Sequence, residues 1–221
     1  YTLRRARRLT IGLTIDHRGL RVGAPHRAPL MEVETLIRKH GDWVAQKLDE
    51  WRERRRPAPQ RLVDGTRLPY LGGWLIVRLS TGSNRAHWTD GEAPVLTLGL
   101  RSPEDAQKVL EKALRIKSLE LFGPRLAHHA ERFAIPTPPL ALSSARTRWG
   151  SCSMKSGIRL NWRLLHCAPH IIDYVIVHEL AHLREMNHSA RFWSIVGEYC
   201  PDYRTIRAEL RQLSGSLPGH A

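Results

Sequence analysis

Apolar residues in the first part of the chain change from a spacing of two to a helical spacing. Leu9, Ile11, Leu13 and Ile15 alternate with threonine and glycine, which predicts a strand with one buried face. A turn at 16–19 and apolar positions in 20–22 predict a second strand that returns beside it. Helices are expected over residues 29–40 and 42–55, and the arginine-rich segment 52–56 and the prolines of 57–59 indicate a linker.

Short apolar stretches after this linker predict further strands. We expect them at residues 68–71, 74–79, 86–89 and 95–98. Two more strands are expected over 140–146 and 158–161, joined by a loop that holds the segment Trp149-Gly150-Ser151-Cys152. The strands would form a β-rich N-terminal half and a small sheet in the C-terminal half.

Helical patterns dominate from Ser102 onward. Ser102, followed by proline and two acids, is typical of a helix N-cap. This helix is expected to run to residue 122, to break at Gly123 and Pro124, and to resume up to residue 133. Three more helices are expected over residues 169–185, 189–199 and 203–213, the second capped by Ser189. The predicted fold class is α+β, with a β-rich region over residues 1–100 and a helical domain with a small sheet over residues 101–221.

Composition and charge limit which partners are expected for this chain. The 221 residues are 42% hydrophobic, and no apolar run approaches the roughly 18 residues of a membrane span, so no membrane partner is expected. Three cysteines without a CxxC pair, and a basic opening stretch without an apolar core, favour the cytoplasm. The net charge of +14 makes nucleic acid a candidate partner through a basic surface. The alternative is that the charge only aids solubility.

One motif, His178-Glu179-Leu180-Ala181-His182, has the spacing of a metal site. Residues four apart lie on one face of a helix, so two imidazoles there converge on one zinc ion. Glu179 is rotated by about 100° from His178 and is placed to take a proton from a zinc-bound water. The surrounding residues are apolar nearly all round, which indicates a buried helix. Core histidines satisfied by hydrogen bonds are the alternative.

A catalytic zinc site usually takes three protein ligands and leaves one position open. The candidates for the third ligand are His188, Glu185 and Glu198. If the helix ends near Asn187, the chain turns back and brings His188 to the ion, so the spacing favours His188. Glu185 lies on the same face as His178, but three ligands from one straight helix strain a tetrahedral site.

Four other residues are candidates for substrate binding. Arg148 and Trp149 precede the Gly-Ser-Cys segment, and this loop is a candidate border of the cleft. The alternative is that Trp149 only packs against the rest of the protein. Asn161 ends a strand that either forms the edge of the cleft, where an extended substrate pairs, or lies in the core. Tyr203 either donates a hydrogen bond to the oxyanion or packs.

These motifs together resemble the YgjP-like family of metal-dependent hydrolases, which is related to the SprT-like proteases. The resemblance rests on residues 149–152, 160–162, 173–182 and 187–193 and extends over nearly the whole chain. It implies a zincin-type helix that supplies His178 and His182, a third histidine at His188 that opens the following helix, and Glu179 as the general base.

The sequence therefore predicts a zinc-dependent hydrolase, expected to be a metalloendopeptidase that acts on a peptide or amide bond of a protein or peptide substrate. One alternative is a DNA-associated, SprT-like protease that is recruited by its basic surface. Another is a nonenzymatic, zinc-stabilised protein that binds nucleic acid. Glu179 argues against the last, because a structural zinc site has no need of a carboxylate beside its first histidine.

Overall fold

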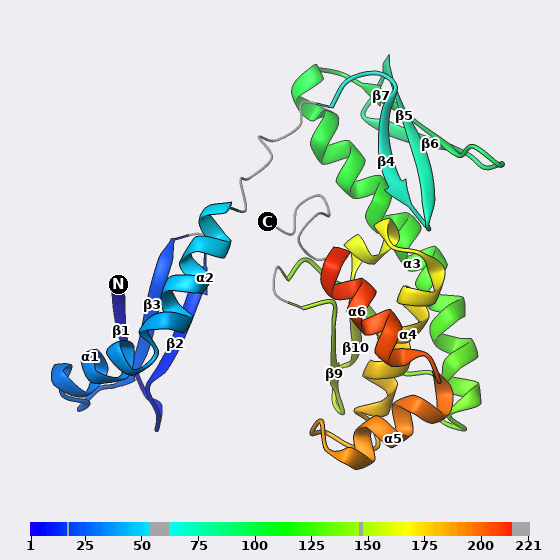
Figure 1. Cartoon of the computed structure of the whole chain (residues 1–221). Helices are drawn as coiled ribbons and strands as arrows, with labels where there is room; N and C mark the ends of the chain where they lie inside the picture. The colour runs from blue at the N-terminus through cyan, green and yellow to red at the C-terminus, as the bar shows by residue number, and fades with distance from the viewer. Residues whose placement is uncertain (17, 54–61, 146–147, 214–221) are drawn as a thin grey trace. The chain divides into compact units, whose positions relative to one another are not determined.

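The computed structural model describes residues 1–16, 18–53, 62–145 and 148–213. The chain divides into two compact units, Tyr1–Pro59 and Gln60–Ala221, and each has its own hydrophobic core (Figure 1). The described residues form six α-helices and three small sheets, which confirms the predicted α+β class. Of the linker predicted over residues 52–59, residues 52 and 53 are helical, and residues 54–59 lie outside the described residues.

The first unit is a three-stranded sheet with two helices packed on one face (Figure 1). Strand β3 (Gly19–Pro25) pairs in parallel with β1 (Thr2–Ala6) and antiparallel with β2 (Gly12–Asp16). Helices α1 (Leu30–Lys39) and α2 (Gly41–Glu53) bury their apolar faces against alternate side chains of the sheet. The β2–β3 hairpin and both helices agree with the sequence prediction. Strand β1 is not predicted, because Leu3 alone of its side chains packs into the core.

The second unit begins with a four-stranded sheet of order β4-β5-β7-β6. Its strands occupy the four predicted positions: β4 (Thr66–Tyr70), β5 (Gly73–Thr81), β6 (Arg85–Thr89) and β7 (Val95–Leu100). Strands β5 and β7 are parallel, and the other pairs are antiparallel. Alternate residues of β5 and β7 are buried, as their spacing predicts.

Helix α3 (Ala106–Arg132) is continuous over 27 residues and follows a short 3-10 turn, η1 (Pro103–Asp105). The predicted break at Gly123 and Pro124 is wrong, since Pro124 lies inside the helix. A proline there costs about 3 kcal/mol, but Phe122 and Leu126 on either side are buried in one core and hold the helix together. Ser102 precedes η1 without a capping bond, and its hydroxyl contacts the Glu104 carboxylate instead.

The boundary between the two compact units lies between Pro59 and Gln60. The boundary predicted between residues 100 and 101 therefore lies inside the second unit. The reason is packing across that boundary. Leu96 and Leu98 of β7 share one core with Val109 and Leu110 of α3, so the strands before residue 100 and the helices after it are buried together.

A small sheet of order β8-β10-β9 lies below the first sheet of this unit in Figure 1. Strand β10 (Gly157–Asn161) pairs in parallel with β8 (Leu140–Ser143) and antiparallel with β9 (Gly150–Ser153). The prediction that residues 149–152 lie in a loop is wrong, because β9 begins at Gly150. This Gly-Ser-Cys-Ser segment has no apolar alternation, and its strand conformation comes from backbone pairing with β10. A 3-10 turn, η2 (Trp162–His166), follows β10.

Helix α4 (Pro169–Ala181) crosses the core of the second unit and packs against α3, β9, α5 (Ala190–Tyr199) and α6 (Tyr203–Leu213). Its end at residue 181 corrects the prediction of about residue 185. The chain leaves the helix there through bonds from Arg184 and Glu185 amides to the Ala181 carbonyl. Ser189 caps α5 as predicted, accepting a bond from the Phe192 amide. Among the described helices, none combines the length and apolar composition that a membrane crossing requires.

Candidate metal centre

Three histidine side chains converge where α4 ends. His178 lies in the last turn of α4, His182 follows at its C-cap, and His188 lies just before α5. One ring nitrogen from each lies within 4.8 Å of the other two, and the Nε2 atoms of His178 and His188 are 3.2 Å apart. Tetrahedral zinc with bonds of about 2.0–2.1 Å separates its ligand nitrogens by roughly 3.3 Å. These three nitrogens could therefore hold one metal ion.

The turn after α4 is what brings His188 to the other two rings. Because the helix ends at Ala181, the chain reverses within the next six residues. The Asn187 side chain then accepts a bond from the Ser189 amide at 3.0 Å, and Ser189 begins α5. Glu185 and Glu198, the alternative third ligands, are outside the group of converging ligand atoms.

Two different contacts orient the rings of His182 and His188. His182 Nδ1 lies 3.2 Å from the Glu185 carbonyl oxygen; when Nδ1 donates to this oxygen, Nε2 is left for a metal. The His188 ring stacks on Trp193, with ring centres 5.7 Å apart, and Trp193 stacks on Tyr203 at 5.3 Å. The Arg207 guanidinium covers the Trp193 ring at 4.6 Å. The stack holds a ring that lies on a loop.

Burial keeps His178 and His182, the two histidines of the motif, neutral. Burial, assisted by the neighbouring His182 and His188, lowers the pKa of His178 to about 3. Burial also lowers the pKa of His182, against the effect of its bond to the Glu185 carbonyl. His178 Nδ1 is buried and has no hydrogen-bond partner among the described residues. Neutral imidazoles are the form that ligates zinc, so the donor set fits that ion.

Glu179 is the one carboxylate buried among the described residues, with 5% of its surface exposed. Burial raises its pKa to about 7, and the nearby Arg148 guanidinium opposes this shift. Strand β9 lies directly beside the carboxylate, because a Cβ atom built on Gly150 would come within 2.5 Å of Glu179 Oε1. A carboxyl group with this pKa can both accept and release a proton near neutral pH.

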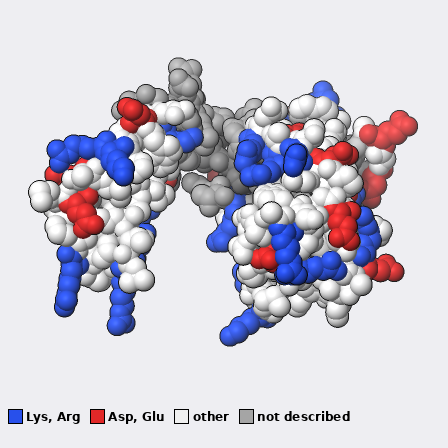
Figure 2. Space-filling view, turned by 60° about the horizontal axis from the view of Figure 1, so that its bottom comes forward, with Lys and Arg blue, Asp and Glu red and all other residues white. Residues whose placement is uncertain are grey.

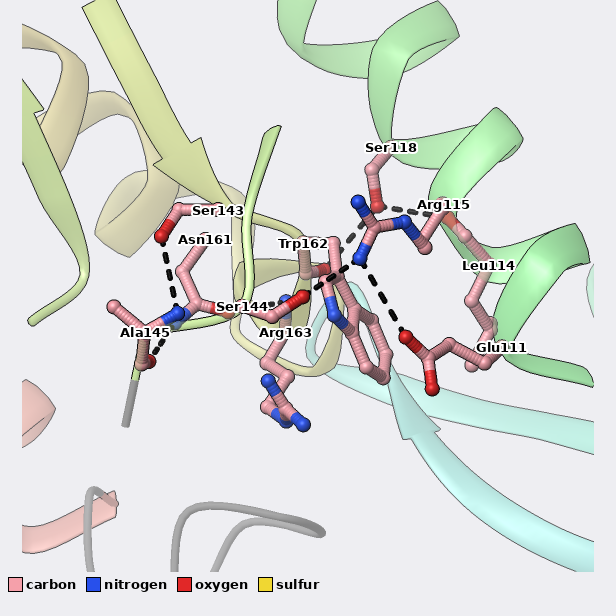
Figure 3. A network of polar contacts seen from close by, with 10 residues as sticks. All are labelled: Glu111, Leu114, Arg115, Ser118, Ser143, Ser144, Ala145, Asn161, Trp162 and Arg163. Atoms are coloured by element: carbon pink, nitrogen blue, oxygen red, sulfur yellow. Dashed lines mark hydrogen bonds and ion pairs between the residues drawn. The ribbon is translucent and has the colours of Figure 1, made fainter. Parts of the chain in front are cut away.

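The structure separates the four other candidates. Arg148 is exposed and close enough to Glu179 to affect its pKa, whereas Trp149 packs against the core. Asn161 is fully buried, and its amide donates to the carbonyl oxygens of Ala145 at 2.7 Å and Arg148 at 3.2 Å. Its side-chain oxygen accepts from the amide that follows Trp162 (Figure 3), so both ends of the Asn161 amide group are bonded to the backbone of the protein.

Tyr203 lies behind Trp193 in the aromatic stack, and its hydroxyl accepts a bond from Arg204 Nε at 3.2 Å. Its placement suits the support of the His188 ring better than a contact with an oxyanion. Sequence reasoning assigned no role to Trp193 or Gly150. The position of Trp193, five residues after His188, could have predicted its contact with that ring, since it places the indole one turn into α5. No local sequence pattern indicates a role for Gly150.

The histidine cluster has the geometry of a metal-binding site, and the chain's sequence places it among metal-dependent hydrolases of the metallopeptidase class. The sequence profile of the YgjP-like family, metallopeptidase domain, matches residues 9–213. The chain belongs to this family, which confirms the resemblance found in its sequence.

Two solved structures are similar to part of the chain. The crystal structure of the metallopeptidase zymogen of Methanocaldococcus jannaschii jannalysin has 19% identity and a TM-score of 0.38, and the match covers 41% of this chain and 94% of that one. The crystal structure of the metallopeptidase zymogen of Pyrococcus abyssi abylysin has 25% identity and a TM-score of 0.38, with 43% of this chain and 95% of that one covered. These TM-scores are too low to transfer any feature. No curated protein matches the chain significantly.

Proposed function

We propose that the protein is a zinc-dependent endopeptidase in which His178, His182 and His188 hold the metal and Glu179 is the general base. The observation that carries this proposal is the position of the only buried carboxylate among the described residues. It lies in the last turns of α4, beside His178 on that helix and His182 at its C-cap. Family membership supports a peptidase, and the three converging ring nitrogens support zinc.

The chemistry follows from the protonation states of these residues. A zinc ion held by His178, His182 and His188 would lower the pKa of a bound water molecule to about 7 and would polarise a substrate carbonyl. The Glu179 carboxylate, itself with a pKa of about 7, takes the proton from the attacking water. It then passes this proton to the leaving nitrogen of the cleaved amide, which keeps the proton balance. Because the His178 and His182 rings are neutral, no proton competes with the metal for their ligand nitrogens.

The free edge of β9 supports an extended peptide as the substrate. β9 is the last strand of the sheet β8-β10-β9 and packs against α4, which carries His178 and Glu179. No other described strand pairs with its outer edge. An extended chain adds to such an edge through main-chain hydrogen bonds, which would place its amide bonds beside Glu179.

The proposal is tested by metal analysis and a peptide-library screen of the full chain. Purified protein is expected to contain about one zinc per chain and to cleave quenched peptides, and Glu179→Gln is expected to keep the zinc and lose cleavage. Glu185→Gln is the matched control and is expected to cleave normally, because Glu185 uses its carbonyl oxygen at the site. Cleavage by Glu179→Gln at the wild-type rate would refute the assigned base.

A second candidate function, recruitment to nucleic acid, is favoured by the open face of the first sheet. Arg4 on β1 is in register with Gly23 on β3, which is in register with Gly12 on β2. The Arg8 side chain lies across both glycines, where a Cβ atom on Gly12 would meet its guanidinium at 2.8 Å. Arg21 is on the same face. Figure 2 shows long Lys and Arg side chains projecting from this unit, at the left of the view.

Arginines held on an exposed sheet face without acidic partners suit a phosphate backbone. Among the described residues, no acid pairs with Arg4 or Arg8, whereas Asp16 pairs with Arg21. Fluorescence anisotropy with a labelled single-stranded oligonucleotide is the test. Binding is expected to weaken steeply with salt and to fall in Arg4→Ser/Arg8→Ser. Equal binding by this variant, or none by wild type at low salt, would remove this candidate.

A further inference from the structure

Strand β9 and helix α4 meet at a point where there is no room for a side chain. A Cβ atom added to Gly150 would lie 2.5, 2.7 and 2.8 Å from Oε1, Cγ and Cδ of Glu179. Real Cβ atoms do not approach heavy atoms this closely. The backbone of β9 therefore lies in direct contact with the carboxylate, and this contact exists only because residue 150 is glycine.

Strand β9 is fixed at this contact by hydrogen bonds from β10. Gly150 pairs with Leu160 of β10, and the next residue of β10, Asn161, donates its backbone amide to the Trp149 carbonyl at 2.7 Å. The fully buried Asn161 side chain also bonds to the carbonyl oxygens of Ala145 (Figure 3) and Arg148, on the segment that leads into β9. Because these bonds anchor the strand, β9 cannot easily retreat from α4.

The carboxylate side of the contact is held much less firmly. No hydrogen bond or ion pair to the Glu179 carboxylate is formed among the described residues, and the Arg148 guanidinium acts on it only at longer range. Packing against Gly150 is therefore the contact that limits where this carboxylate lies. If a side chain entered at position 150, the flexible Glu179 side chain would move before the strand did.

We propose that Gly150 is a positioning residue that sets the place of the Glu179 carboxylate in the cleavage reaction. This inference rests on the proposed function, in which Glu179 is the general base. A general base must lie within hydrogen-bond reach of the proton that it takes, and a displacement of about 1 Å at a reacting group can cost roughly 100-fold in rate. Gly150 would thus act through Glu179 without touching the substrate.

The variant Gly150→Ala is suited to testing this role because the strand accepts alanine. Gly150 is not among the glycines with a positive φ angle, so its backbone conformation is open to any L-residue. Gly123→Ala in α3 is the matched control, because a Cβ atom there meets nothing within 4 Å. Both variants add one methyl group, and only one of them reaches Glu179.

The first measurement needs no activity. Melting temperatures of the metal-free full chain are compared for Gly150→Ala in three backgrounds: wild type, Glu179→Gln and Glu179→Ala. Gln keeps the shape of Glu, whereas Ala leaves space for the new methyl group. Gly150→Ala is expected to lower the melting temperature when residue 179 is Glu or Gln and to leave it unchanged when residue 179 is Ala. An equal loss in all three backgrounds would overturn the proposal, because the methyl group would then disturb β9 itself.

The second measurement is kinetic. Zinc-loaded Gly150→Ala is expected to keep the wild-type zinc content and a KM within about twofold, while kcat falls about 100-fold. Gly123→Ala is expected to match wild type in all three quantities. A Gly150→Ala variant with wild-type kcat would overturn the positioning role. If wild type itself cleaves no peptide while the melting temperatures depend on residue 179 as expected, the proposed function fails and the contact between Gly150 and Glu179 stands.

Discussion

The cores of the two units are built from different kinds of side chain. The first unit buries only aliphatic residues among those described: Leu20, Val22, Ala24, Ala28, Val33 and Val44. The second unit has a larger apolar core and also buries five polar side chains, those of Ser118, His129, Asn161, His166 and Glu179. A buried polar group without a partner costs about 1–3 kcal/mol, so each of these five needs a physical reason.

Hydrogen bonds account for four of the five. Ser118 bonds to the Leu114 and Trp162 carbonyls, His166 to the Pro69 carbonyl, and His129 to Asp173. Asn161 bonds to three backbone groups. Glu179 alone has no such partner among the described residues. The comparison therefore separates polar residues that stabilise the fold from the one buried acid whose retention points to chemistry.

The largest effect is expected from removing a histidine of the cluster. His182→Ala should lose bound zinc and lower peptide cleavage by roughly 1000-fold or more, because two remaining ligands cannot hold a catalytic ion. Zinc content by elemental analysis and cleavage rates check this expectation. His87→Ala, on the exposed β6 strand, is the control and should retain both. A His182→Ala variant with full zinc content would refute the assigned ligand set.

The next effect concerns a buried polar residue with a structural explanation. Asn161→Ala should lower the free energy of unfolding by about 3 kcal/mol, since it leaves two backbone carbonyls and one amide of the second unit without partners. Urea unfolding of the metal-free protein measures this change. Asn161→Asp keeps the acceptor but replaces the donor to Ala145 and Arg148 with an oxygen, so it should be at least as destabilising. A neutral Asn161→Ala would contradict the proposed anchoring of β9.

A smaller, pH-dependent effect is expected at the contact of α3 and α4. Burial would raise the pKa of Asp173, but bonds from His129 and Arg125 outweigh it and lower this pKa below 3.8. The stabilisation is therefore present above pH 3.8 and is lost as the pH falls through the lowered value. Asp173→Asn should remove about 1–2 kcal/mol at neutral pH, and its loss of stability between pH 5 and pH 3 should be shallower.

Urea unfolding across this pH range measures the effect, with exposed Asp202→Asn as the control. Arg125 Nη1 donates to both Asp173 oxygens at 2.8 Å, and His129 Nε2 lies 3.3 Å from one of them. A wild-type profile for Asp173→Asn would show that this half-buried pair contributes nothing, as many exposed pairs do.

The smallest effect on the site is expected from the first unit. Arg4→Ser/Arg8→Ser should change the free energy of unfolding by less than about 0.5 kcal/mol and leave zinc content and peptide cleavage unchanged, because both side chains lie on the open face of the sheet. Urea unfolding, zinc analysis and cleavage assays check this. A loss of zinc in this variant would show that side chains of the first unit affect the metal site of the second unit.

Local spacing explains how much of the fold was predictable. The hairpin of the first unit, the four strands after residue 65 and the helices near the C-terminus all follow from side-chain periodicity, which each segment carries by itself. Three elements did not follow from it. Strand β1 is mostly arginine and small residues, β9 is a strand only through its pairing with β10, and α3 passes through Pro124 because the core holds both of its halves.

The sequence by itself determined the chemistry available at the site, because His178 and His182 are four residues apart on one helix face and Glu179 follows His178 directly, so none of the three needs a distant partner. Only the tertiary structure decided how that chemistry is arranged. His188 reaches the other rings because α4 ends at Ala181, and its ring is held by Trp193 and Tyr203. Gly150 meets Glu179 because β10 holds β9 against the helix. The contact between Gly150 and Glu179 depends on packing between segments distant in the chain, which no local pattern encodes.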